Sequence, residues 1–280
     1  MKRKLIINFT STGMIPTKEM TPHVPITTDE IVKDILRAGE LGASIAHVHA
    51  RDENGAPSWK KELYEEIFKG VREKNKDIIL CATTSGRDYP EFEKRSNVLE
   101  IEEPYKPDMA SLTLSSLNFN KTASLNAPDM IKALVTKMNE KGIKPELEAF
   151  DLGMINYAKY LIHKDLLKPP YYFNLLFGNI ACAQANLQSV GLMVNELPEN
   201  SIYAFAGIGN FQLFMNSLAV IAAHGVRVGL EDNIHFDEER KKLATNEMLV
   251  KRIVDTANAL EVEISTPKET REMLGLKNVS

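Results

Sequence analysis

The chain has 280 residues, a formal net charge of −4 and 44% hydrophobic residues, which is the composition of an ordinary globular protein. Lys and Arg form no basic stripe, so nucleic acid is not expected as the main partner and small molecules are favoured. The apolar stretch Leu5–Phe9 is too short for a signal peptide or a membrane span. Cys81 and Cys182 lie far apart, which argues against a disulfide framework and favours a cytoplasmic protein without a membrane partner.

Short β-rich segments alternate with helical segments along the whole chain. The pattern predicts eight strands, at Leu5–Phe9, Ser44–His49, Ile78–Thr83, Ala110–Leu114, Lys144–Phe150, Tyr171–Phe177, Ile202–Ala206 and Val226–Leu230. Between them it predicts helices at Thr28–Leu41, Lys60–Lys74, Glu91–Leu99, Pro128–Lys141, Leu152–His163, Cys182–Val194, Phe211–His224 and Glu238–Glu261. A capping box at Thr27 to Glu30 and a C-cap at Gly42 are expected to bound the first helix.

Eight βα units in this length predict an α/β fold, the (β/α)₈ TIM barrel, as a single domain over residues 1–280. The rival architecture is a doubly wound sheet, which gathers its ligand site at one switch point. Here polar residues stand at the end of nearly every predicted strand, and in a barrel they would form a ring. The barrel is therefore the expected fold.

Two histidines mark the end of the second predicted strand. Because side chains alternate along a strand, His47 and His49 project from the same face. On the last strand, Arg227 and Glu231 share the inward face. Two imidazoles and one carboxylate, with a fourth position open, are what a catalytic Zn²⁺ needs. The alternative is a pair of hydrogen-bonded core histidines.

The same alternation assigns further polar residues to the barrel interior. The inward positions of the middle strands are Cys81, Thr83, Ser85, Ser111, Thr113, Glu146 and Glu148. The two glutamates could serve as a third metal ligand, orient an imidazole N–H, or be surface charges if the register is shifted by one. The turn Thr83-Thr84-Ser85-Gly86 offers O–H and N–H donors that could hold a carboxylate.

Arg227 and Asp232 form a second candidate group. An inward arginine is costly to bury unless it meets an anion or a carboxylate. Asp232 stands just past the strand end, where it is suitably placed to take a proton α to a metal-bound carbonyl. A solvated loop aspartate is the alternative. The Gly207-Ile208-Gly209 turn is as compatible with a tight turn as with a phosphate site.

Short motifs along the whole chain match those of a known enzyme family. Its carriers are Thr12-Gly13, Pro25-Ile26-Thr27, His47-Val48-His49, Thr83-Thr84-Ser85-Gly86, Lys106-Pro107-Asp108-Met109-Ala110-Ser111, Leu117-Asn118-Phe119, Gly153-Met154, Ala206-Gly207-Ile208-Gly209, Arg227-Val228-Gly229-Leu230-Glu231-Asp232-Asn233 and Thr266-Pro267. Nearly end to end, the chain resembles the β-keto acid cleavage enzymes. The resemblance implies a zinc-dependent TIM barrel, expected as a homotetramer, that reacts a β-keto acid with acetyl-CoA to give acetoacetate and a new acyl-CoA.

The resemblance also implies roles for individual residues. His47, His49 and Glu231 would hold Zn²⁺, and Asp232, supported by Arg227, would remove the α-proton. Thr83 and Ser111 would place hydroxyls around the substrate carboxylate, and Ser85 and Gly86 would add backbone donors. The predicted substrate-binding residues also include Thr113 and Ile15.

Ile15 is a departure from the family pattern. Members that cleave 3-keto-5-aminohexanoate carry a glutamate two residues after the Thr-Gly of the first loop, and here that position is Ile15, preceded by Met14. An apolar side chain cannot pair a buried ammonium. We therefore expect a β-keto acid with a neutral or apolar acyl end.

The sequence is also compatible with two other functions. A zinc-dependent barrel aldolase or hydrolase would use the same metal without acetyl-CoA. A zinc-stabilised barrel could also serve as a non-catalytic scaffold. No cluster of basic residues indicates where the CoA nucleotide binds.

Overall fold

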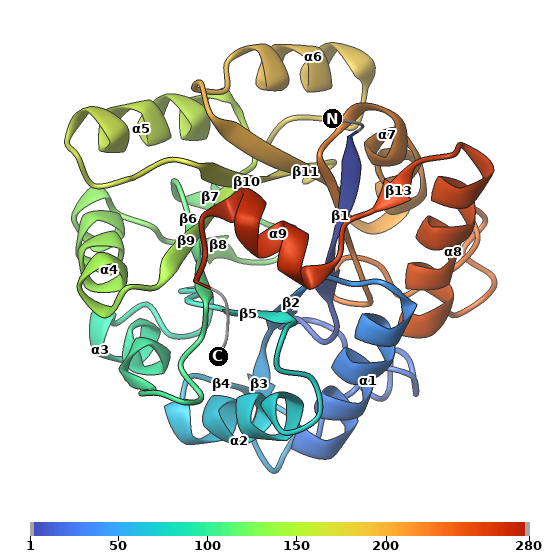
Figure 1. The fold of residues 1–280 in the computed structure, drawn as a ribbon, viewed down its shortest axis with the longest axis horizontal. Coiled ribbons are helices and arrows are strands. Elements are labelled where there is room, and N and C mark those ends of the chain that lie inside the picture. Colours follow the sequence, from blue (N-terminus) through green and yellow to red (C-terminus); the bar gives the residue numbers. More distant parts are fainter. Residues whose placement is uncertain (1–2, 278–280) are drawn as a thin grey trace.

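The computed structural model describes residues 3–277, and its main feature is a closed barrel of parallel strands ringed by helices (Figure 1). The strands are β1 (Lys4–Thr10), β2 (Ile45–Val48), β3 (Ala50–Arg51), β4 (Pro57–Ser58), β5 (Ile79–Ala82), β6 (Met109–Thr113), β7 (Leu117–Asn118), β8 (Ala123–Ser124), β9 (Lys144–Ala149), β10 (Tyr171–Phe177), β11 (Ser201–Gly207), β12 (Gly225–Val228) and β13 (Glu263–Ile264).

The helices lie between these strands. They are α1 (Thr28–Leu41), α2 (Lys61–Arg72), α3 (Phe92–Arg95), α4 (Pro128–Lys141), α5 (Leu152–His163), α6 (Leu187–Asn195), α7 (Gln212–Ala222), α8 (Asn246–Ala259) and α9 (Pro267–Leu274), with 3₁₀ turns η1 (Asn97–Glu100) and η2 (Gly209–Phe211). None of the helices within residues 3–277 has both the length and the apolar character that a membrane crossing requires.

The barrel follows the order β1, β2, β5, β6, β9, β10, β11, β12 and closes where β12 pairs with β1. All these pairings are parallel, so the carboxyl ends of the strands meet at one end of the barrel. The register places His47 beside Thr10 on one side and Cys81 on the other. The predicted TIM barrel and its eight strands are confirmed.

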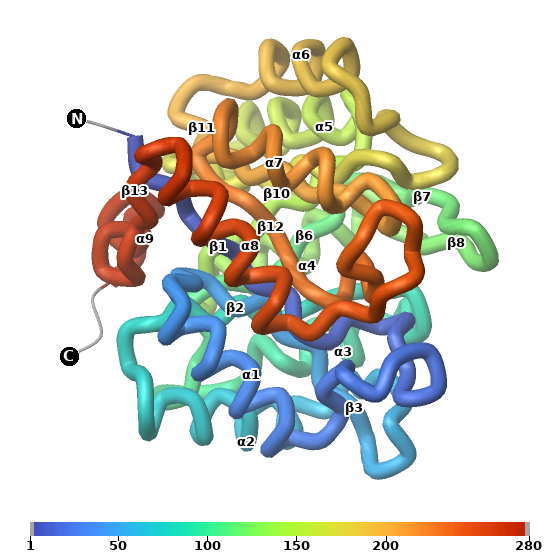
Figure 2. The backbone as a smooth tube through the Cα atoms, turned by 90° about the vertical axis from the view of Figure 1, so that its right-hand side faces the viewer, coloured from blue at the N-terminus to red at the C-terminus, as the bar shows by residue number. Residues whose placement is uncertain are grey.

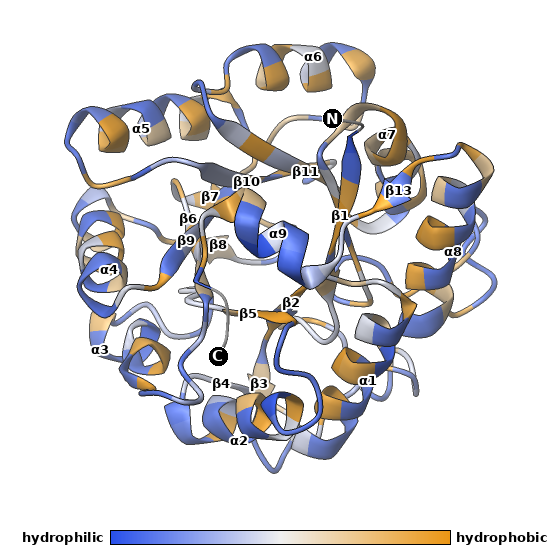
Figure 3. Ribbon diagram, viewed as in Figure 1, coloured by the Kyte–Doolittle hydropathy of each residue, from blue (hydrophilic) through white to orange (hydrophobic). Residues whose placement is uncertain are grey.

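Apolar side chains fill the space between the barrel and its helices. In Figure 3 the helices around the barrel combine apolar and polar residues. On α1 the buried residues are Ile31, Val32, Ile35 and Ala38, spaced as one helical stripe. The capping box at Thr27 and the left-handed C-cap at Gly42, with φ 117°, are present as predicted.

The amino-terminal end of the barrel is closed by an element that the sequence pattern did not predict. Helix α9 lies across this end, and Figure 2 shows it with β13 on the side opposite the β3 and β7–β8 segments. Leu274 of α9 is fully buried in a cluster with Ile6, Ile45 and Ile79. Arg271 donates to both oxygens of Asp108, at 2.8 and 3.0 Å.

Three predicted helices are wrong in extent. The segment Glu91–Leu99 is a single turn of α-helix followed by a 3₁₀ turn. Helix α6 begins only at Leu187, because the Asn186 side chain accepts a hydrogen bond from Ser189 N and caps the helix there. Helix α8 begins at Asn246, where Thr245 is the N-cap.

Candidate active site

Two imidazoles meet at the carboxyl end of β2. His47 and His49 are both buried, and their Nε2 atoms lie 3.3 Å apart. The alternation of β2 therefore directs both rings to one point inside the barrel, as the sequence predicts. The other nitrogen of His47, Nδ1, lies 2.6 Å from a carboxylate oxygen of Glu146.

Glu231 reaches the same point from the turn after β12. Its Oε1 lies 3.4 Å from His49 Nε2. The turn approaches β1 so closely that a Cβ on Gly229 would collide with the Thr10 carbonyl, and a Cβ on Gly13 would meet the Glu231 side chain at 2.5 Å. Glycine at these two positions is what lets Glu231 enter the site.

Glu146 lies fully buried beneath the histidines. It accepts a hydrogen bond from Asn8 Nδ2 at 2.7 Å and one from the Cys81 thiol at 3.3 Å, besides its contact with His47. Burial favours a raised pKa, but the His47 imidazole and Arg227 outweigh it and lower the pKa of Glu146 to about 2. Of the roles considered for Glu146, the geometry matches the one that orients an imidazole N–H.

The three side chains His47, His49 and Glu231 fit a metal ion. Their nearest ligand atoms are separated by 3.3 and 3.4 Å, and ligands at about 2.0–2.1 Å from a tetrahedral Zn²⁺ lie roughly 3.3–3.4 Å apart. Glu231 Oε2 is buried and has no hydrogen-bond partner among the described residues. The Glu146 contact assigns the proton of His47 to Nδ1, which leaves Nε2 as a lone-pair donor.

The protonation of the two histidines differs. Burial lowers the pKa of His47, but the carboxylates of Glu146 and Glu231 outweigh it and raise the pKa to about 9. Burial lowers the pKa of His49 and prevails over the opposing effect of Glu231, so this ring is neutral. A cation at the common point would replace the extra proton of His47.

Arg227 gathers three carboxylates beside this cluster. Its guanidinium donates to Glu231 Oε1 at 2.7 Å, to Glu148 Oε1 at 3.0 Å and to Asp232 Oδ2 at 3.1 Å. Asp232 is almost fully buried and is also hydrogen-bonded by Thr10 at 3.4 Å. Burial and the Glu231 carboxylate raise the pKa of Asp232 against the lowering effect of Arg227. Asp232 is thus a buried carboxylate with a raised pKa, which suits it to exchange a proton.

The predicted hydroxyl donors lie on neighbouring strand ends. Thr83 is half-buried and its hydroxyl accepts from Ser85 N at 3.1 Å. Ser111 is buried, and its hydroxyl accepts from Thr84 N at 3.1 Å. Thr113 donates to Glu148 at 2.7 Å, so it fixes the position of a carboxylate that is also bound by Arg227. Gly86 packs directly against the Arg95 guanidinium.

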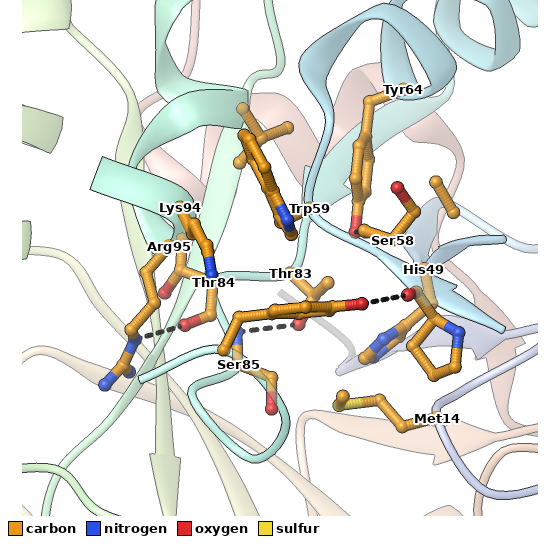
Figure 4. Close-up of a pocket in the computed structure, with 14 residues that line it drawn as sticks. Met14, His49, Ser58, Trp59, Tyr64, Thr83, Thr84, Ser85, Lys94 and Arg95 are labelled. Carbon is orange, nitrogen blue, oxygen red and sulfur yellow. Dashed lines mark hydrogen bonds between the residues drawn. The ribbon is translucent and has the colours of Figure 1, made fainter. Parts of the chain in front are cut away.

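A pocket opens beside His49 (Figure 4). His49, Thr83 and Ser85 line it together with Met14, which lies beside His49, and Trp59, which lies on the opposite side of the pocket from Met14. Ile15, the predicted substrate-binding residue, is 54% exposed and is not among the residues that line the pocket. Met14, one residue earlier, takes the place inside it.

Several residues at the site were not singled out from the sequence. Asn8 and Thr10 lie two residues apart on β1 and contact Glu146 and Asp232, respectively. Polar residues at alternate positions of an otherwise apolar strand were the available signal. The Gly207–Gly209 segment is a tight turn in which the Gly209 amide donates to the Asp232 carbonyl at 2.7 Å.

Comparison with known proteins adds to this geometry. A family model described as beta-keto acid cleavage enzyme matches residues 4–276. A 3-keto-5-aminohexanoate cleavage enzyme of Fusobacterium nucleatum is 35% identical over 99% of this chain and 100% of its own length. A 3-dehydrocarnitine:acetyl-CoA trimethylamine transferase of Rhizobium meliloti is 31% identical over 99% of this chain and 98% of its own.

Further similarities concern another named activity and the fold. A 3-oxoadipate:acetyl-CoA acetyltransferase of Cupriavidus necator is 30% identical, covering 100% of this chain and 97% of its own. Among solved structures, the apo form of ObcA superposes with a TM-score of 0.81 at 21% identity, over 91% of this chain and 66% of the ObcA chain. That structural likeness supports the barrel fold alone. On the match over residues 4–276 and these relatives, the chain belongs to the beta-keto acid cleavage enzyme family.

Proposed function

We propose that this protein transfers the acyl group of a β-keto acid to CoA, with acetyl-CoA as the second substrate, and that it works with Zn²⁺. The products are acetoacetate and a new acyl-CoA. Relatives whose names specify acetyl-CoA as the acceptor support the co-substrate. The observation that carries the proposal is the convergence of His47, His49 and Glu231 beside the Arg227–Asp232 pair.

His47, His49 and Glu231 would hold the ion, and a divalent metal there supplies Lewis-acid polarisation of a carbonyl oxygen. Glu146 keeps His47 in the required orientation through its 2.6 Å contact. Arg227 holds Glu231 and Asp232 on either side of one guanidinium, so the ligand and the base are fixed relative to each other.

Asp232 is the proposed general base. It takes a proton from the carbon between the keto and carboxylate groups, and that carbon then attacks the acetyl carbonyl of acetyl-CoA. The released CoA thiolate attacks the original keto carbon, and the bond between that carbon and its neighbour breaks. Asp232 returns its proton to the acetoacetate enolate, so every atom and proton is accounted for.

The pocket beside His49 supports a substrate with a neutral or apolar acyl end. Of the fourteen described residues that line it, none carries a carboxylate, whereas Met14 and Trp59 offer apolar surface. A substrate ammonium would be desolvated there without a counter-charge. The named substrates of the relatives differ widely, so family membership does not fix this choice.

An assay for acetyl-CoA-dependent acetoacetate formation tests the function. We expect turnover of 3-oxohexanoate by the Zn²⁺-loaded protein and much weaker turnover of 3-keto-5-aminohexanoate. A preference for the aminated acid would overturn the substrate class. Consumption of the β-keto acid at the same rate without acetyl-CoA would point instead to the aldolase or hydrolase reading.

A further inference from the structure

Arg87 lies at the carboxyl end of the barrel and contacts an aromatic ring, but no carboxylate among the described residues pairs with its charge. It follows the Thr83–Gly86 turn, and its side chain is half-buried. Its Cζ lies 3.6 Å from the centre of the Phe119 ring. Its Nε is buried and has no hydrogen-bond partner among the described residues. Its guanidinium also forms no ion pair with a carboxylate of residues 3–277.

The buried arginines of the described chain differ from half-buried Arg87 in their hydrogen bonding. Each of them donates to carbonyl or carboxylate oxygens, as seen for Arg51, Arg72, Arg95, Arg227 and Arg271. A guanidinium has five N–H donors and is costly to remove from water unless they are satisfied. Arg87 is the exception, and its location is the catalytic end of the barrel.

The surroundings of Arg87 point toward the site. Burial lowers the pKa of Arg87, while the negative charges of Glu231, Asp88 and Glu148 act in the opposite direction. Two of these carboxylates belong to the Arg227 cluster and are already paired there. Arg87 therefore stands within the electrostatic reach of the site without being neutralised by it.

Phe119 forms a platform that orients this guanidinium. It follows β7, and its ring packs edge-on against Phe150 with centroids 6.0 Å apart. Stacking covers one face of the guanidinium and leaves its N–H edge, which is the part that binds oxyanions in pairs. The backbone N of Arg87 donates to the Ser85 hydroxyl at 3.4 Å, so the turn with the predicted carboxylate donors and Arg87 are one unit.

We propose that Arg87 binds an oxyanion of the reactants, and that this anion is the carboxylate of the β-keto acid. The inference rests on the proposed function and names a charged contact that the hydroxyls of Thr83 and Ser111 do not supply. A phosphate of CoA has the same chemistry and is the other possible source. An unpaired cation at this place also disfavours a cationic substrate.

Binding of unreactive probes to the metal-loaded protein tests the proposal by calorimetry, without any turnover. The probes are acetoacetate, acetone as its analogue without a carboxylate, and coenzyme A. We expect Arg87→Ala to weaken acetoacetate binding about 10- to 100-fold, as for loss of a charged hydrogen bond, and to leave acetone and coenzyme A unaffected. Arg87→Lys should restore part of the affinity, because it keeps the charge and loses the paired geometry.

The controls separate anion binding from folding. Arg37→Ala removes an exposed arginine that pairs with Glu40 and Glu247 far from the site, and it should change nothing. Phe119→Leu removes the platform but keeps the charge, and it should weaken acetoacetate less than Arg87→Ala. Thermal unfolding of each variant shows that it is folded.

The outcomes are distinct. Weakened binding of coenzyme A with unchanged acetoacetate would assign Arg87 to a phosphate. Unchanged binding of both by folded Arg87→Ala, or no binding of either by the unmodified protein, would overturn the proposal. If acetoacetate binding depends on Arg87 but the protein shows no acetyl-CoA-dependent turnover, the anion site is supported and the proposed reaction is wrong.

Discussion

Asp232 shows how single side chains set the chemistry of this barrel. It is buried, receives hydrogen bonds from Arg227 and Thr10, and has a raised pKa. Asp232→Asn keeps the shape of the side chain and removes the proposed base, so we expect kcat to fall about 10²- to 10⁴-fold while bound Zn²⁺ is retained. Steady-state kinetics and metal analysis check this. Asp255→Asn, at an exposed aspartate paired with Lys251, should be neutral. Full activity of Asp232→Asn would remove Asp232 from the reaction.

Glu146 acts on the site through His47. Glu146→Gln retains the volume but loses the charge that holds the imidazole N–H, so Zn²⁺ affinity should fall about 10- to 100-fold. Competition with a chelator measures this affinity without any assay of turnover. Glu196→Gln, at an exposed glutamate paired with Lys159, is the matched control. Equal affinities of both variants would mean that Glu146 does not support the metal site.

Lys144 offers a test by pH away from the site. Burial lowers the pKa of Lys144 from its ordinary value of 10.5 to about 8. Between these values the unfolded chain binds more protons, so the stability penalty is complete below about pH 8 and disappears above about pH 10.5. Lys144→Met should raise the unfolding free energy by about 1–2 kcal/mol at pH 7 and by almost nothing near pH 11. Urea unfolding at both values measures it. The exposed Lys74→Met should show no such pH dependence.

For single residues, the sequence predicted which side chains converge on one point better than it predicted their individual contacts. The alternation of β2 and the turn after β12 placed His47, His49 and Glu231 correctly at one point. It could not show that Thr113 bonds Glu148, or that Met14 rather than Ile15 lines the pocket. Those outcomes depend on rotamers and on loop paths, which the periodicity of strands and helices does not encode.

Helix α9 is the element whose contribution is most easily tested. Arg271 is 2% exposed and holds Asp108 with both ends of its guanidinium. Arg271→Met should lower the unfolding free energy by about 3 kcal/mol, because the Asp108 carboxylate would lose one of its two arginines and keep only Arg72 and the Leu80 amide. Chemical unfolding measures the change. Lys268→Met on the exposed side of α9 should leave stability within about 0.5 kcal/mol. A similar value for Arg271→Met would show that α9 does not anchor this end.

The accuracy of the element predictions follows from packing. The eight barrel strands are short apolar runs bounded by turns, and all of them were found. Helix α9 and β13 were missed because both are short, with eight and two residues, and follow the predicted end of the last helix at Glu261. Helix α9 is held in place by contacts such as that of Arg271 with Asp108. The helix starts at Leu187 and Asn246 were misplaced because residues with high helix propensity precede both caps, such as the charged run 238–242 before Thr245.

For the whole molecule, we expect the barrel to fold without an ion at the candidate metal site. Strand pairing closes the barrel through backbone hydrogen bonds. The contacts of Glu146 with Asn8 and His47 are made directly between these side chains, without an ion between them. Removal of Zn²⁺ by a chelator should therefore abolish turnover and lower the melting temperature, while the far-ultraviolet circular dichroism of the folded barrel remains. Added Zn²⁺ should restore activity. Loss of the barrel signal on chelation would mean that the ion is needed for folding.

The pairing of β1 with both β12 and β13 bears on how this protein is made. Strand β1 leaves the ribosome long before two of its neighbours in the sheet, β12 and β13, are translated. Until then, both β1 and the growing sheet present an open edge, which invites association with other chains. Glu231 is likewise translated long after His47 and His49. A chain interrupted between them would therefore carry two of the three candidate ligands, and its barrel would not be closed.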